Sequence, residues 1–132
     1  ELLLLHGLVP IIANGNYSMF SGYEAVTTLM ADKNNIPTAI FCANDSMAIG
    51  AHRRLYELGY KIPNDISLIG VDDMEPVKYL SPASLTSVRQ ELAESGKIAG
   101  DLIIDSINKG SIYTNKIVMK QKLIKRESVK QI

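Results

Sequence analysis

Several residue types that would indicate a specific class of protein are scarce in this chain of 132 residues. There is no tryptophan, and a single cysteine, Cys42, excludes a disulfide within the chain. Basic and acidic residues number 14 each, so the chain has no overall positive charge of the kind that attracts nucleic acid. The apolar stretch Leu2–Leu5 is far too short to cross a membrane. These absences leave a globular protein of ordinary composition, large enough for one small domain.

The sequence motifs of common enzymes and metal sites are missing as well. The chain contains no glycine-rich phosphate-binding loop, no H-E-x-x-H and no C-x-x-C, and it has no G-x-S-x-G nucleophile elbow. Its histidines, His6 and His52, have no cysteine or acidic partner at metal-ligand spacing. We therefore expect no catalytic residue, no metal and no cofactor, and the sequence favours a binding protein over an enzyme.

The start of the chain lacks the features of a signal peptide. ELLLLHGLVP has no basic region and no small-residue cleavage site, and it is typical of a helix that ends at Gly7. Because the chain opens in mid-helix, we expect it to be a fragment of a longer protein. Cys42 lies within an apolar stretch, so it is predicted to be a buried small side chain, which fits a reducing, cytoplasmic compartment.

The stretch Pro37–Asp73 organises the chain as strand, helix, strand. Thr38–Ala43 and Ile66–Val71 are short apolar runs, as expected for strands covered on both faces. Between them lies a helical stripe of apolar residues: Met47, Ala48, Ala51, Leu55 and Leu58. Two buried strands joined by a helix should be parallel, so this stretch predicts an α/β fold with a parallel sheet.

Polar side chains follow both predicted strands. Asn44 and Asp45 come directly after the first strand, and Asp72 and Asp73 come after the second. Parallel strands bring these residues to one edge of the sheet, which is where open α/β sheets bind ligands. One amide and three carboxylates can accept hydrogen bonds from several hydroxyl or N–H groups. Each residue also has a purely structural alternative, since Asn44 or Asp45 can cap the helix and Asp73 can cap a turn.

An aromatic residue precedes a second predicted helix near the same edge. Leu8–Asn14 is a candidate strand, and a candidate helix begins at Ser18 or Ser21 and runs to about Asp32, so Tyr17 between them falls just after a strand end. Its ring is placed either to stack on a sugar or base or to pack against the core. After Asp73 we expect a short helical segment, an extended piece, an amphipathic helix and a strand, in this order: Met74–Leu80, Leu85–Val88, Gln90–Asn108 and Ile117–Ile124.

Four segments of the chain together resemble the LacI/GalR family of bacterial transcription regulators. They are PTAIFCANDSMAIGA, then PNDISLIGVDD, then LTSVRQ, and finally LIKRES. Each segment alone is modest, but their order and spacing are specific and extend from Gly15 to Ser128. The resemblance implies the parallel-sheet sandwich of type I periplasmic binding proteins, present here as a fragment that comprises mostly the second subdomain. The DNA-binding helix-turn-helix of the family is absent.

The resemblance also implies a division of the chain. Residues 1–84 would form the C-terminal effector subdomain, incomplete at its start. Residues 85–116 would be a crossover and a helix that belongs to the first subdomain, and residues 117–132 a returning strand and tail. The helix Gln90–Asn108 would then expose an apolar face that is covered by the first subdomain in the family.

Residue by residue, the resemblance implies an effector site and a dimer contact. Tyr17 matches the aromatic residue that stacks on the effector, Asn44 the polar residue that hydrogen-bonds it, and Asp72 the aspartate that binds its hydroxyls. Asn16 matches a more variable polar neighbour, and Asp45, the adjoining helix-capping position, is grouped with them. The family's dimer contact matches the helix face with Ile49, His52, Arg53 and Tyr56 and the segment with Pro76, Tyr79 and Leu80.

The function that this resemblance implies is effector binding and dimerisation in a transcriptional regulator. We expect the effector to be a small molecule, specifically a sugar. Its binding would close a cleft and change how DNA-binding heads outside this chain bind the operator. The alternative is a periplasmic sugar-binding protein of a transport system, which shares the fold and the pocket edge. A small α/β enzyme is a third, less favoured reading because the chain lacks catalytic motifs.

Overall fold

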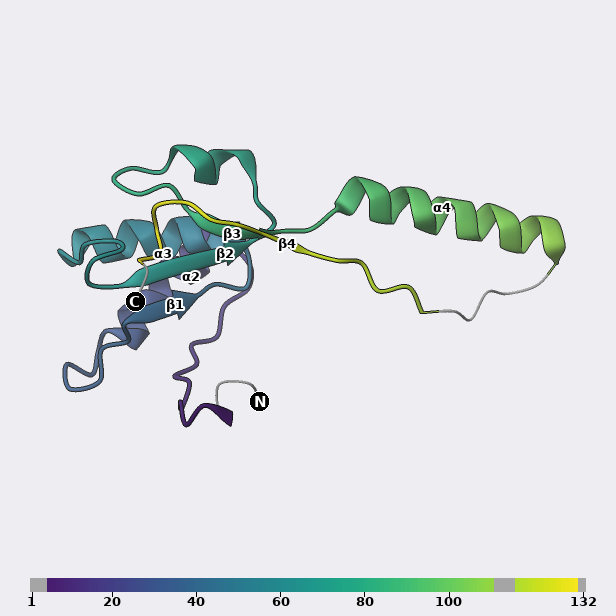
Figure 1. Cartoon of the computed structure of the whole chain (residues 1–132). Coiled ribbons are helices and arrows are strands. Elements are labelled where there is room, and N and C mark those ends of the chain that lie inside the picture. Colours follow the sequence, from purple (N-terminus) through teal and green to yellow (C-terminus); the bar gives the residue numbers. More distant parts are fainter. Residues whose placement is uncertain (1–4, 111–115, 131–132) are drawn as a thin grey trace.

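The computed structural model describes residues 5–110 and 116–130, and these residues contain a single four-stranded sheet. The strand order is β1-β2-β3-β4, where β1 is Ala39–Phe41, β2 is Ser67–Val71, β3 is Thr86–Arg89 and β4 is Lys122–Ile124 (Figure 1). β1, β2 and β3 are parallel, and β4 pairs antiparallel with β3. The predicted parallel pairing of the first two strands is confirmed, so both strands end at the same edge.

One helix precedes β1 and another follows it, and a side chain caps the start of each helix. α2 is Met19–Leu29, and the Ser18 hydroxyl accepts a hydrogen bond from the Ser21 N–H at 3.1 Å. α3 is Asp45–Glu57, and the Asn44 side chain accepts one from the Met47 N–H at 2.8 Å. These bonds satisfy N–H groups that the first turn of a helix leaves without a partner. The sequence left both helix starts open, and the structure selects Ser18 over Ser21 and Asn44 over Asp45.

α2 and α3 pack so closely that two positions accept only glycine. A Cβ on Gly50 of α3 would overlap the Met19 carbonyl oxygen, and a Cβ on Gly22 of α2 would overlap the Met47 carbonyl oxygen. Both obstacles are backbone atoms, which cannot rotate away as a side chain can. The two glycines therefore determine the approach of the helices, and α3 in turn packs on β2.

The hydrophobic core lies between this helix pair and one face of the sheet. Its fully buried side chains come from α2, α3, β2 and the connections between the strands: Val26, Leu55, Ile66, Leu68, Val77 and Leu85. Burial of such aliphatic side chains is the main favourable term in folding, at about 1.5–3 kcal/mol each. Cys42 belongs to this core, as the sequence predicts.

Three sequence predictions about strands differ from the structure. Leu8–Asn14 is not a strand, because its backbone has no pairing partner among the described residues. The last strand covers Lys122–Ile124 rather than Ile117–Ile124. β1 is covered on one face only: Ile40 is buried, whereas Ala39 and Phe41 are exposed.

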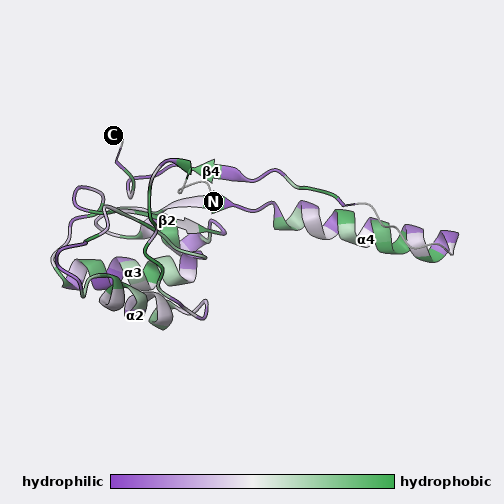
Figure 2. Cartoon of the chain, turned by 90° about the horizontal axis from the view of Figure 1, so that it is seen from below, coloured by the Kyte–Doolittle hydropathy of each residue, from purple (hydrophilic) through white to green (hydrophobic). Residues whose placement is uncertain are grey.

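α4 (Leu92–Lys109) stands apart from the rest of the described chain and ends at Gly110, which has a φ of +60°. In Figure 1 it projects away from the sheet, beyond the end of β3. None of its residues is buried, and Figure 2 shows hydrophobic residues along its length. The apolar face that the sequence analysis expects on this helix is therefore exposed. The chain also contains η1, a 3₁₀ helix at Glu75–Tyr79, where a short helical segment was predicted.

No helix among the described residues is both long enough and apolar enough to span a bilayer.

Substituting the contact glycines should separate the helix pair. Gly50→Ala should lower the free energy of unfolding by about 1–3 kcal/mol, since the added methyl group meets backbone and forces α2 away from α3. Gly100→Ala on α4 is the matched control: a Cβ there meets nothing, and alanine favours a helix by about 0.5–1 kcal/mol. Urea unfolding followed by circular dichroism measures both, and equal stability of the two variants would contradict this packing.

Candidate functional site

Asn44 and Asp72 lie at the carboxyl ends of the neighbouring parallel strands β1 and β2. The Asn44 side-chain oxygen caps α3, and its amide nitrogen donates to the Tyr17 carbonyl oxygen at 3.1 Å. One amide hydrogen and one oxygen lone pair remain for another partner. Asn44 thus caps α3, which is one of the structural alternatives left open by the sequence, and it also connects the end of β1 to the segment that carries Tyr17.

Tyr17 sits at this edge in an unusual backbone conformation, with a φ of +67° and its ring mostly exposed. The preceding Asn16 stabilises the turn, because its side-chain oxygen accepts from the Ser18 N–H at 3.2 Å and from the Ser18 hydroxyl at 2.7 Å. An exposed tyrosine ring offers an apolar face and a polar hydroxyl. The side-chain oxygen of Asn16 is therefore occupied by hydrogen bonds within the turn that positions Tyr17.

Asp72 has a φ of +111°, which non-glycine residues rarely adopt; residues strained in this way cluster at functional sites. Its backbone N–H donates to the Val88 carbonyl at 2.9 Å. Its Oδ1 accepts from the Gln90 side-chain amide, also at 2.9 Å, and Oδ2 has no hydrogen bond within the described residues. Asp72 is half-buried, so this oxygen is a suitable acceptor for a ligand hydroxyl.

Asp45 corrects one expectation of the sequence analysis, because it is fully buried and cannot contact a ligand at the edge. Its Oδ1 accepts from the Ser87 hydroxyl and its Oδ2 from the Met74 N–H, both at 2.7 Å. Burial is the larger effect and holds the pKa of the Asp45 carboxyl above its ordinary value, although these two hydrogen bonds act in the opposite direction. Asp45 instead joins α3 to β3 and to the segment after β2.

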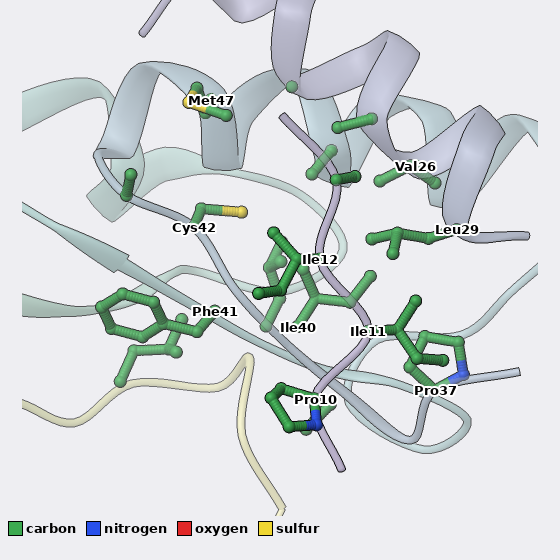
Figure 3. Close-up of a pocket in the computed structure, with 18 of the residues that line it drawn as sticks. Pro10, Ile11, Ile12, Val26, Leu29, Pro37, Ile40, Phe41, Cys42 and Met47 are labelled. Atoms are coloured by element: carbon green, nitrogen blue, oxygen red, sulfur yellow. The ribbon is translucent and has the colours of Figure 1, made fainter. Parts of the chain in front are cut away.

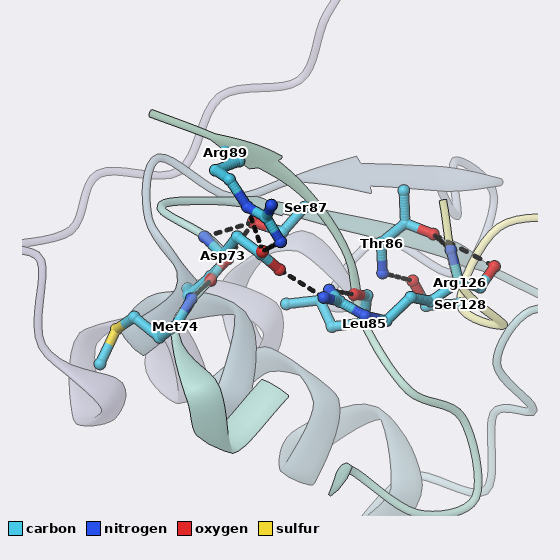
Figure 4. Close-up of polar contacts among 9 residues, drawn as sticks. Asp73, Met74, Leu85, Thr86, Ser87, Arg89, Arg126 and Ser128 are labelled. Carbon is cyan, nitrogen blue, oxygen red and sulfur yellow. Dashed lines mark hydrogen bonds and ion pairs between the residues drawn. The ribbon is translucent and has the colours of Figure 1, made fainter. Parts of the chain in front are cut away.

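Asp73, which the sequence analysis places with the other carboxylates at the ligand edge, instead forms an ion-pair cluster with two arginines (Figure 4). The Asp73 side chain is only 2% exposed. Its Oδ2 accepts hydrogen bonds from Arg89 Nε at 2.8 Å and from Arg89 Nη2 at 2.6 Å, and its Oδ1 accepts one from Arg126. Burial alone would raise the pKa of Asp73, but the hydrogen bonds and charges of Arg126 and Arg89 outweigh it and hold that pKa below its ordinary value. No sequence pattern pairs residues that lie so far apart along the chain.

Most residues of the predicted dimer contact lie on the surface, with one exception. The tyrosines Tyr56 and Tyr79 are 61% and 76% exposed. The other surface members are exposed or half-buried: Ile49, Arg53, Pro76 and Leu80. His52 is only 4% exposed, because its ring is packed inward and hydrogen-bonds the Ala83 backbone. The structure therefore removes His52 from the predicted contact surface.

An apolar groove of about 940 Å³ lies beside β1. Figure 3 shows Pro10, Ile11 and Ile12 on one side and Ile40 and Phe41 of β1 on the other. Its lining includes Tyr17 but neither Asn44 nor Asp72. Because the walls are mainly aliphatic and few polar groups converge there, the groove is a poorer candidate for a polar ligand than the strand-end edge.

Residues 6–129 match the model of the "Periplasmic binding protein-like domain" family. The PurR repressor of Serratia proteamaculans is 37% identical over 118 residues, 89% of this chain and 34% of the relative. The probable ExuR repressor of Bacillus subtilis is 34% identical over 118 residues, 89% of this chain and 35% of the relative. The chain therefore spans about a third of the length of these curated relatives.

Solved structures of transcription regulators superpose on nearly the whole chain. A complex of the regulator CelR with cellobiose has a TM-score of 0.87 at 28% identity, covering 96% of this chain and 39% of that one. A LacI-family regulator from Enterococcus faecium with bound ribose has a TM-score of 0.81 at 28% identity, covering 96% and 47%. The site thus lies in a domain of the periplasmic-binding-protein class. The chain belongs to this family, and its resemblance to LacI-type regulators is confirmed.

His52 should make stability depend on pH in a predictable direction. Burial lowers the pKa of its imidazole, although the hydrogen bond to Ala83 opposes this, and Nε2 has no partner among the described residues. Below about pH 6.5 the unfolded chain binds a proton that the folded chain resists, so stability is lost as the pH falls through that value. His52→Met, which cannot titrate, should lose less stability between about pH 7 and pH 5.

Urea unfolding at a series of pH values tests this, with the exposed His6→Gln as the control that keeps the pH dependence of the wild type. If the wild type and His52→Met lost equal stability as the pH falls, His52 would not be the source of the pH dependence, and the prediction would be wrong.

Proposed function

We propose that this chain is the effector-binding part of a transcriptional repressor and that its effector is a sugar. The observation that carries the proposal is the convergence of Tyr17, Asn44 and Asp72 at the carboxyl edge of two parallel strands. Ligands of open α/β sheets bind at this edge. The repressors among its relatives and the sugar-bound regulators among its structural neighbours support the same function.

The residues at this edge suit the chemistry of a sugar. Asp72 Oδ2 accepts a hydrogen bond from a hydroxyl, and the remaining amide hydrogen of Asn44 donates one. The exposed ring of Tyr17 stacks on the C–H face of a pyranose or furanose. None of these groups is a nucleophile or an activated base, so the proposed activity is binding without catalysis.

In the longer protein, we propose that the sugar shifts a population between two arrangements of subdomains. A ligand can only do this by its difference in affinity for the two arrangements. α4 and the crossover, residues 85–116, would belong to the first subdomain, residues 1–84 would form the second, and residues 117–132 would be the returning strand and tail. A dimeric Lac repressor bound to operator and anti-inducer is among the structural neighbours, which supports DNA binding by a separate part of the protein and a cytoplasmic location.

The proposed dimer surface combines one face of α3 with η1 and its end. It contains the exposed rings of Tyr56 and Tyr79 together with Ile49, Arg53, Pro76 and Leu80. Exposed aromatic side chains that share a surface are typical of protein contacts. A periplasmic transport protein is the weaker alternative, because the matched relatives are repressors.

Removing the Asp72 carboxylate should abolish the sugar response and leave the fold intact. In the full-length protein, Asp72→Ala should weaken sugar binding about 10- to 100-fold, the value of a hydrogen bond to a charged group. Calorimetric titration against ribose, cellobiose and related mono- and disaccharides measures this, with the exposed α4 variant Asp105→Asn as the control. Unchanged affinity in Asp72→Ala, or no sugar bound by the wild type, would contradict the proposal.

A further inference from the structure

One carboxylate connects both chain segments that join α4 to the rest of the molecule. The outgoing segment is β3 and the residues before α4, and it carries Arg89. The returning segment is β4 and the residues after it, and it carries Arg126. Asp73, at the end of β2, accepts hydrogen bonds from both arginines through different oxygens (Figure 4). The Asp73 side chain therefore binds both the outgoing segment, through Arg89, and the returning segment, through Arg126.

The same corner of the molecule contains further bonds to both segments. The Asp73 N–H donates to the Ser87 hydroxyl at 3.0 Å. Arg126 donates through Nη1 to the Leu85 carbonyl at 2.7 Å, and its backbone N–H donates to the Thr86 hydroxyl at 2.9 Å. The outgoing and returning segments are thus bound to each other and to the end of β2.

The burial of the cluster makes the Asp73 charge necessary. The Asp73 carboxylate is 2% exposed and the Arg126 side chain 14% exposed, whereas Arg89 is 41% exposed. Without the carboxylate, Arg126 would keep its positive charge in a poorly hydrated place and face a second cation. Removing one partner of such a buried pair is strongly unfavourable, because the other is left uncompensated.

Asp73 also adjoins the proposed ligand contact. Asp72 and Asp73 are consecutive and both have positive φ angles, +111° and +57°. The Asp72 carboxylate binds Gln90, which is the residue after Arg89 and lies just before α4. A shift of the Asp72 side chain toward a ligand must therefore act on the outgoing segment at the point where Asp73 holds it.

We propose that Asp73 is a positioning residue that fixes the outgoing and returning segments relative to the ligand edge and so sets the orientation of α4. Its role in relaying a ligand signal depends on the proposed function, whereas its role in fixing the two segments is independent of any ligand. The relay proceeds from Asp72 through Gln90, and Asp73 with its two arginines provides the rigid point about which the segments move.

The test compares Asp73→Asn with wild type by amide hydrogen exchange in the 132-residue chain without ligand. Asparagine has the same shape but no charge, so the arginines should detach while the core persists. We expect the Asp72 and Arg126 amides, which bond to Val88 and Thr86, to exchange about 10-fold faster. The amides of Ala48, in the first turn of α3, and Tyr60, just after the end of α3, should change less than about twofold.

Pulsed electron paramagnetic resonance with spin labels at Lys61→Cys and Asp101→Cys measures the orientation of α4. Asp73→Asn should broaden the distance distribution, and Asp105→Asn, the same change in an exposed ion pair of α4, should leave it unchanged. Arg89→Gln is a milder second variant, since this arginine is partly exposed, and it should broaden the distribution to a smaller extent.

Uniformly faster exchange throughout the chain would show that Asp73 only stabilises the fold and would overturn the proposal. Unchanged exchange at Asp72 and Arg126, or an unchanged distance distribution in Asp73→Asn, would overturn it as well. Because no sugar is used, a failure of sugar binding leaves these results interpretable.

Discussion

The parallel pairing of β1 with β2 is the constraint on which the rest of the structure depends. It aligns Ala39 with Ser67 and Phe41 with Ile69, and so brings the residues after both strands to one edge. α3 connects the strands and starts at Asn44, directly at that edge. Antiparallel pairing would send Asn44 and Asp72 to opposite ends of the sheet, and the polar cluster would not exist.

Consecutive or nearby carboxylates at this edge have different roles because their surroundings differ. Asp45 is buried under two hydrogen bonds and fastens α3 to β3. Asp73 is buried between two arginines and fastens the segments that lead to α4. Asp72 retains an oxygen without a partner in the described chain and is half-buried. Burial and hydrogen bonding thus separate one candidate ligand contact from two residues that hold it in place.

Sequence patterns predicted the parts of this fold that depend on local chemistry or short-range periodicity. The apolar runs and the helical stripe between them are such features, and the structure confirms them. For the two helix caps, which the sequence left open, the structure selects Ser18 over Ser21 and Asn44 over Asp45. The roles of Asp45, His52 and Asp73 could not be predicted, because each depends on a partner distant in sequence: Ser87, Ala83 and Arg126. The strand predicted at Leu8–Asn14 failed for a similar reason, since a strand requires a neighbour that local sequence does not reveal.

The most direct test of this account is a crystal structure of the full-length protein with a bound sugar. The account predicts a sugar hydroxyl within hydrogen-bond distance of the free Asp72 oxygen, a second near the Asn44 amide, and the Tyr17 ring against the C–H face of the sugar. A sugar bound in the apolar groove beside β1, or anywhere away from the carboxyl ends of β1 and β2, would contradict it.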